Sequence, residues 1–162
     1  MQELFFIANK VYLNFVTGNY HEALVNLNII LNNKKSNVRQ DINSWTRIFQ
    51  LLIHFEKGNT ELLPYLIKSI YRDLLQKNKL YKTEKIFIQF IRHKLAPVKS
   101  KKDQIAAFKV LKDELMKACN DPLEAGFQEN NIVINWLESK IQNQTIEDIL
   151  REKSGYVLEG EE

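Results

Sequence analysis

The chain has few of the residues that build tight turns and covalent crosslinks. Its 162 residues include only five glycines, three prolines and one cysteine. The scarcity of glycine and proline disfavours a sandwich of many short strands and favours helices. The single cysteine, Cys119, excludes an internal disulfide and is typical of a protein from a reducing compartment.

Long uncharged apolar runs are missing as well. No stretch approaches the roughly 18 apolar residues that a membrane span needs, and the first ten residues lack the cationic start of a signal peptide. These absences predict a cytoplasmic protein without a membrane partner. Because the helical pattern starts at the first residues with no capping segment before it, we expect the chain to be the C-terminal part of a larger helical-repeat protein.

Two Gly-Asn dipeptides each stand between two long segments of helical periodicity. They lie in residues 17–24 and 57–63, with Gly18 and Gly58 separated by 40 positions. Glycine and asparagine tolerate the left-handed backbone angles that a helical hairpin turn needs. A repeat period of this length is typical of stacked helical hairpins.

Apolar residues recur at helical spacing along the whole chain and predict an all-α protein of about eight helices. We expect the helices to pair as antiparallel hairpins over about 1–33, 36–77 and 79–119, followed by terminal helices over about 129–153. Together they form one helical-repeat domain over 1–155. Residues 156–162 form an acidic tail that we expect to be frayed.

Local patterns mark two helix starts and three core positions. Residues 100–103 and 145–148 begin with Ser or Thr and end with Asp, which is the pattern of a helix-capping box. Trp45 and Trp136 each lie in an apolar stripe, and Cys119 lies at an apolar position near a helix end. We expect all three side chains to be part of a core.

The first Gly-Asn turn resembles the turn and second-helix opening of the tetratricopeptide repeat. The residues that carry this resemblance are Gly18, Tyr20, Glu22, Ala23 and Leu24. The second turn departs from the family, because Leu63 stands where the small alanine is expected, and the third hairpin has no glycine turn.

Residues 45–95 and 135–140 also resemble the C-terminal part of uncharacterised tetratricopeptide-like proteins of Bacteroidetes. The resemblance implies a right-handed solenoid of antiparallel helix hairpins that is used for protein–protein contact. Function is not fixed by a fold, so the partner has to come from the residues themselves.

The residues that carry most catalysis and metal binding are isolated in this sequence. His21, His54 and His93 have no ligand-spaced His, Cys or carboxylate neighbours, and Cys119 has no base nearby in the sequence. Phosphate-binding loops and nucleophile motifs are absent too. We therefore predict a protein that is not an enzyme, with no catalytic, cofactor-binding or metal site.

The charge of the chain is unevenly distributed. Residues 68–117 hold 14 Lys or Arg against 5 Asp or Glu, a net +9, whereas residues 118–162 have a net −7. Within the basic part, Lys82, Lys85, Gln89 and Arg92 follow i, i+3, i+7 and i+10 spacing and share one face of a predicted helix. An ordinary solvated helix face is one interpretation of this pattern. The functional one is a site for an acidic peptide, or for the chain's own residues 147–162.

Nucleic acid is the main alternative partner for the basic region over 82–117. Lys exceeds Arg by 18 to 5 across the chain. Because Arg is the residue that reads bases and stacks on them, this ratio disfavours sequence-specific recognition and leaves non-specific phosphate contact.

The sequence as a whole predicts a non-catalytic scaffold or adaptor for protein–protein interaction. The alternatives are a nucleic-acid-associated regulator that uses the 82–117 surface, and a purely structural cap at the end of a solenoid. The sequence leaves the identity of the partner and the oligomeric state open.

Overall fold

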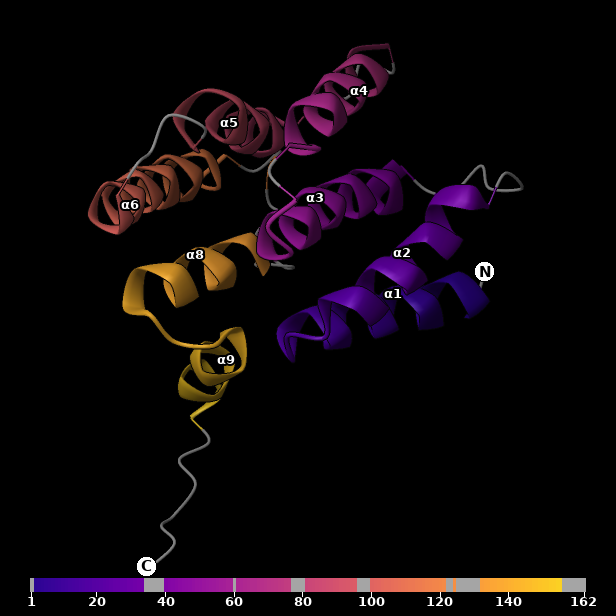
Figure 1. Cartoon of the computed structure of the whole chain (residues 1–162), viewed down its shortest axis with the longest axis horizontal. Helices are drawn as coiled ribbons and strands as arrows, with labels where there is room; N and C mark the ends of the chain where they lie inside the picture. The colour runs from indigo at the N-terminus through magenta and orange to yellow at the C-terminus, as the bar shows by residue number, and fades with distance from the viewer. Residues whose placement is uncertain are drawn as a thin grey trace, which may run out of the picture. The chain divides into compact units, whose positions relative to one another are not determined.

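The computed structural model describes residues 2–33, 40–59, 61–76, 81–95, 100–121, 124 and 132–155. Within these ranges the chain forms eight α-helices and one π-helical segment, and no strand (Figure 1). The expectation of an all-α protein is therefore confirmed. Internal contacts divide the chain into two compact units, Met1–Leu80 and Tyr81–Glu162.

The first unit contains four helices. They are α1 (Gln2–Val16), α2 (Tyr20–Asn32), α3 (Gln40–Glu56) and α4 (Leu63–Gln76). Each helix packs against the next one along the chain. α1 and α2 lie within 1–33, and α3 and α4 lie within 36–77.

The two Gly-Asn turns adopt the same backbone motif. Gly18 and Gly58 have φ angles of +77° and +70°, and both lie directly after a helix. Asn19 N–H donates to the carbonyl of Asn14 over 2.7 Å, and Asn59 N–H donates to the carbonyl of His54 over 3.0 Å. Each bond runs from the N–H of residue i to the carbonyl of residue i−5, and a glycine in the left-handed conformation precedes the donor. This is the Schellman motif, which ends a helix. The two turns are thus copies in structure as well as in sequence.

The copies continue into the helices that follow the turns. Three positions of α2 and the positions of α4 that lie 40 residues later are all buried. The pairs are Ala23 with Leu63, Leu27 with Ile67, and Ile30 with Ile70. Leu63 thus stands at the position of the small Ala23 and is also buried. A core accepts a larger apolar side chain where its neighbours can repack around it.

An aromatic cluster holds the two hairpins of the first unit together. The ring of Phe49 on α3 lies 5.3 Å from the ring of Phe15 and 6.5 Å from that of Tyr12, both on α1. Trp45 is half-buried, with its ring 4.2 Å from that of Phe49. Aromatic pairs at these distances contribute about 0.5–1.5 kcal/mol each beyond the burial of their area.

The second unit contains the remaining elements. They are α5 (Lys82–Phe90), the π-helical segment η1 (Ile91–Leu95), α6 (Lys101–Ala118), α8 (Ile132–Gln142) and α9 (Ile146–Ser154). Trp136 is fully buried at their centre, with the ring of Phe108 at 5.2 Å and that of Phe87 at 6.3 Å. The core role expected for Trp136 is confirmed.

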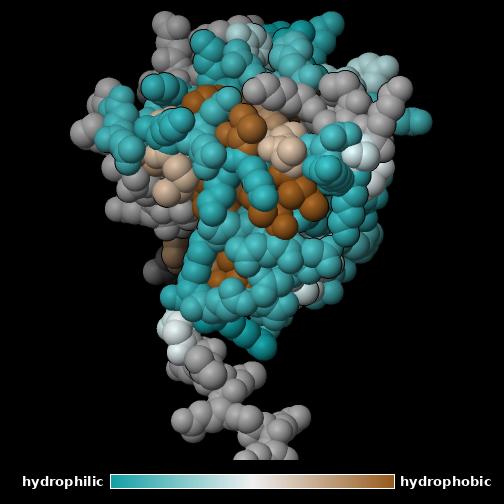
Figure 2. Space-filling model, turned by 90° about the vertical axis from the view of Figure 1, so that its left-hand side faces the viewer, coloured by the Kyte–Doolittle hydropathy of each residue, from teal (hydrophilic) through white to brown (hydrophobic). Residues whose placement is uncertain are grey.

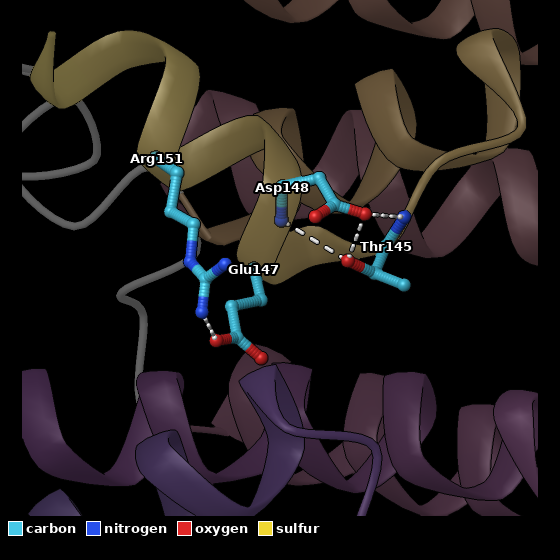
Figure 3. A network of polar contacts seen from close by, with 4 residues as sticks. All are labelled: Thr145, Glu147, Asp148 and Arg151. Atoms are coloured by element: carbon cyan, nitrogen blue, oxygen red, sulfur yellow. Dashed lines mark hydrogen bonds and ion pairs between the residues drawn. The ribbon is translucent and has the colours of Figure 1, made fainter. Parts of the chain in front are cut away.

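Both predicted capping boxes open helices. Thr145 Oγ1 accepts from Asp148 N–H over 3.0 Å, and Asp148 Oδ2 accepts from Thr145 N–H over 3.3 Å (Figure 3). Ser100 Oγ likewise accepts from Asp103 N–H at the start of α6. These bonds satisfy donors that a helix start leaves without partners.

Some expectations fall outside the described residues. These are the start of the terminal helices at 129–131, the acidic tail over 156–162 and the hairpin ends at 34–39, 77 and 79–80. Within the described ranges, none of the helices combines the length and apolarity that crossing a membrane requires.

Candidate functional site

The four residues of the predicted basic face are all exposed. Lys82, Lys85 and Gln89 project from α5, and Arg92 belongs to η1. The opposite side of α5 is apolar as expected, with Phe87 fully buried. We call the four exposed residues the basic row.

The helix does not run regularly through the basic row. The α-helix ends at Phe90, and Ile91–Leu95 form a π-helical turn. A π-helix bonds from residue i to residue i+5 and is wider than an α-helix. Three members of the row therefore lie on α5, and the fourth, Arg92, lies on the π-helical turn that follows it. Because π-turns need extra favourable contacts to persist, they often mark functional segments.

The carboxylate of Glu124 caps the N-terminus of α5, and no sequence pattern predicts this contact. Glu124 is 6% exposed. Its carboxylate accepts from Lys82 N–H over 2.7 Å, from Thr83 N–H over 3.1 Å and from the Thr83 hydroxyl over 2.6 Å. Because these N–H groups already have an anion, the start of α5 does not hold an anionic ligand, and the basic row must act through its side chains. No local pattern reveals this contact, since Glu124 lies 42 positions from Lys82.

A shallow groove adjoins the basic row. It has a volume of about 360 Å³ and is lined by Ile86, Gln89, Phe90, His93 and Glu114. Its lining comes from α5, η1 and α6. Phe90 is buried and Ile86 half-buried, so the groove has an apolar floor with Gln89, His93 and Glu114 exposed around it. Gln89 therefore belongs to both the groove and the basic row.

The thiol of Cys119 has the surroundings of a core residue. Cys119 is 5% exposed at the end of α6. Burial, and secondarily the negative charge of Glu124, raises the pKa of this thiol. A nucleophilic cysteine needs the opposite shift, because the thiolate is the reactive form. The core position predicted for Cys119 is confirmed.

The three histidines differ in their exposure to solvent. His21 and His93 are exposed, whereas His54 is half-buried at the end of α3. Burial, and secondarily the charge of Lys57, lowers the pKa of His54, and its Nδ1 lies 3.2 Å from Nδ2 of Asn59. In the neutral ring Nδ1 accepts a hydrogen bond from that amide, which ties the helix end to its turn. Among the described residues, no three His, Cys, Asp or Glu side chains gather closely enough to hold a metal ion.

A buried polar cluster joins three helices of the second unit. Glu138 on α8 is 8% exposed and pairs with Lys112 Nζ of α6 at 2.7 Å and with Lys153 Nζ of α9 at 2.5 Å. Lys153 also donates to Asn135 Oδ1 over 2.8 Å. Burial raises the pKa of Glu138, but the two ammonium groups outweigh it, so the pKa lies below the usual value. This cluster links α6, α8 and α9, and in it Lys112 forms an ion pair with Glu138.

The acidic side chains of α9 also interact with residues in or next to the same helix. Glu147 pairs with Arg151 at 2.6 Å, and Asp148 belongs to the cap of α9 (Figure 3). Glu152 accepts from Gln144 over 2.7 Å. The hypothesis that residues 147–162 fill the basic row therefore rests on residues 156–162, which lie outside the described part of the chain.

Hydrophobic side chains also reach the surface. The face drawn in Figure 2 is mostly hydrophilic, with hydrophobic side chains gathered near its middle. Among the described residues, the most exposed large hydrophobic side chains are Phe5, Phe6, Leu13 and Tyr65, all in the first unit.

Comparisons with known proteins give no relative for this chain: no family model, no curated protein and no solved structure matches it.

Proposed function

We propose that the chain is a non-catalytic module for protein–protein interaction, and that its basic row binds an acidic segment of a partner protein. The observation that carries this proposal is the exposed row of Lys82, Lys85, Gln89 and Arg92 beside a groove with an apolar floor. A surface with both features binds a peptide by charge and by side-chain insertion.

The row and the groove divide the recognition between them. The cations of Lys82, Lys85 and Arg92 attract carboxylates and set the orientation of the segment. Gln89 offers both a donor and an acceptor to the peptide backbone. The floor at Phe90 accepts one apolar side chain and supplies binding free energy that does not depend on charge.

The architecture that we propose for this module is a tetratricopeptide-like stack of antiparallel hairpins. The support is the pair of identical Gly-Asn turns and the three pairs of equivalent buried positions in the first unit. Hairpins with this repeat bury one side against their neighbour, and their other sides vary freely, which suits a scaffold or adaptor. Under this proposal the basic row is a variable surface of the third hairpin.

Peptide binding tests the proposal directly. The probe is a short fluorescent peptide of Asp and Glu with one central Leu, and the readout is its anisotropy on titration with the full chain. Combined substitution of Lys82→Glu, Lys85→Glu and Arg92→Glu is expected to weaken binding by about tenfold or more, since three attractive charges become repulsive. The matched control changes the same number of charges on α6, with Lys102→Glu, Lys109→Glu and Lys117→Glu, all exposed residues. It is expected to change affinity by about twofold at most.

Three results would overturn the proposal. If the peptide binds equally well to both triple variants, the basic row is not the site. If a single-stranded oligonucleotide of matched charge binds more tightly and with the same sensitivity, the row serves nucleic acid. A chain that binds neither probe is a structural cap, which also contradicts the proposal.

A further inference from the structure

The basic row and the groove beside it have a fixed spacing along α5. The groove floor is at Phe90, and Lys82 lies eight positions before it on the same helix. At about 1.5 Å per residue, the two positions are about 12 Å apart along the helix axis. Gln89 lies between them and also lines the groove. The site therefore favours a segment whose apolar side chain and carboxylate are about 12 Å apart, with a backbone that Gln89 can reach between them.

The chain itself contains a segment with this spacing. Residues 156–162 read Tyr-Val-Leu-Glu-Gly-Glu-Glu, with three carboxylates and no cation. In an extended segment, side chains alternate between two sides and residues are about 3.3 Å apart, so Leu158 and Glu162 would share one side at about 13 Å from each other. Gly160 would lie between them on that side, and because it has no side chain it leaves the backbone open to Gln89.

The segment of one chain does not reach the basic row of the same chain. α9 ends at Ser154 and packs against α8, which also contacts α5 through the rings of Trp136 and Phe87. In Figure 1, α8 lies between α5 and α9. Phe87 is on the side of α5 opposite the row, so two helix spacings of about 8–10 Å and half the width of α5 separate α9 from the row. The three residues from Gly155 to Leu158 span at most about 11 Å.

We propose that residues 158–162 of one chain bind the basic row and groove of a second copy, so that the chain associates head to tail. In this arrangement Leu158 enters the groove at Phe90, and Glu162 pairs with Lys82. The two other carboxylates of the segment add attraction to the remaining cations of the row. The inference rests on the proposed function of the site and names its partner. Because the contact uses different surfaces on the two copies, it extends to a ring or to an open chain.

Two variants, each with one half of the contact removed, test this arrangement. One chain ends at Gly155 and keeps the basic row, and the other keeps residues 156–162 and carries Lys82→Glu, Lys85→Glu and Arg92→Glu. Sedimentation equilibrium of the unaltered chain is expected to show association between about 10 µM and about 1 mM, because a contact of about five residues is smaller than a standard interface. Each variant alone is expected to associate at least about tenfold more weakly. Their mixture is expected to form a complex of one copy of each and no larger species, since each supplies one intact half.

Two single substitutions test the spacing. Leu158→Gln removes the side chain that enters the groove and is expected to weaken association by about fivefold or more. Val157→Gln is the matched control, because Val157 is on the opposite side of an extended segment, and it is expected to change association by less than about twofold. Both variants keep the charge of the segment, so the difference between them measures the insertion of Leu158.

The inference fails on any of three results. An unaltered chain that stays monomeric up to about 1 mM would show that the segment has no site on a second copy. A mixture of the two variants that stays monomeric, while the unaltered chain associates, would place the contact on other surfaces. Equal effects of Leu158→Gln and Val157→Gln would show that the spacing does not select the segment.

The peptide titration separates this inference from the proposed function. If the chain that ends at Gly155 binds the acidic peptide while the unaltered chain does not self-associate, the proposed function stands and only this inference fails. If that shortened chain binds no acidic peptide either, both fail.

Discussion

At the scale of single residues, the side chains with the most consequence are carboxylates that sequence patterns do not reveal. Glu124 and Glu138 are both buried and both act on backbone or side-chain groups of other helices. Taking a carboxylate out of water is unfavourable unless it is paired, so each must be held by several donors. The basic residues are easier to recognise in the sequence, but the sequence does not show that Lys112 forms an ion pair with the buried Glu138.

Substitution of Glu138 with Gln is expected to lower the free energy of unfolding by about 1–2 kcal/mol at pH 7. The estimate follows charge-assisted hydrogen bonds, reduced because Lys112 and Lys153 remain partly exposed. The pKa of Glu138 is lower in the folded chain than its ordinary value of 4.5. Its contribution is therefore fully present above pH 4.5 and is lost as the pH falls through the folded pKa.

Urea unfolding of both proteins at pH 7 and at lower pH measures this effect. The difference between wild type and Glu138→Gln is expected to shrink on acidification. Glu147→Gln is the control, because its pair with Arg151 is exposed, and it should cost less than about 0.5 kcal/mol. A difference for Glu138→Gln that stays constant with pH would contradict the expectation.

At the scale of elements, local signals were predictable and long-range ones were not. The Gly-Asn turns and the caps at Ser100 and Thr145 use residues within five positions of one another, so their patterns could be read in the sequence. The π-turn after Phe90 and the Glu124 contact depend on how helices meet, and no short pattern encodes them. Lys82, Lys85 and Gln89 are exposed on α5, and the fourth residue of the row, Arg92, is exposed on the π-turn that follows it.

Substitution of Gly18 or Gly58 with Ala is expected to destabilise the chain by about 1 kcal/mol each, because an L-residue in the left-handed region is strained. A Cβ at either position meets no atom within 4 Å, so backbone strain is the whole effect. Since the two turns share one motif, the two costs are expected to be alike. Thermal unfolding of Gly18→Asn provides the control, because asparagine tolerates this conformation and should cost less. Unequal costs would show that the turns are not equivalent.

At the scale of the whole molecule, the charged and the apolar parts of the surface are expected to respond differently to salt. In the proposed function the basic row acts through exposed cations, whereas the floor of the groove beside it is apolar at Phe90. Charge interactions are screened over about 10 Å at 0.1 M salt and about 3 Å at 1 M. Apolar contact is not weakened in this way.

Affinity for the acidic peptide is therefore expected to fall by about tenfold or more between roughly 0.1 and 1 M sodium chloride. The contribution of the apolar floor at Phe90 is expected to stay constant over the same range. Fluorescence anisotropy on a salt series measures the change in affinity. Peptide binding that ignores salt would show that the groove, rather than the cations, provides the affinity.

Glu124, which caps α5, lies 42 positions after Lys82, and this separation has a consequence for folding during synthesis. A ribosome adding roughly 5–20 residues per second needs about 2–8 s to pass from Lys82 to Glu124. A helix forms in about a microsecond or less, so α5 can form and unfold about a million times or more before Glu124 is available to its first turn. The second unit is therefore completed only after the nascent chain has delivered Glu124.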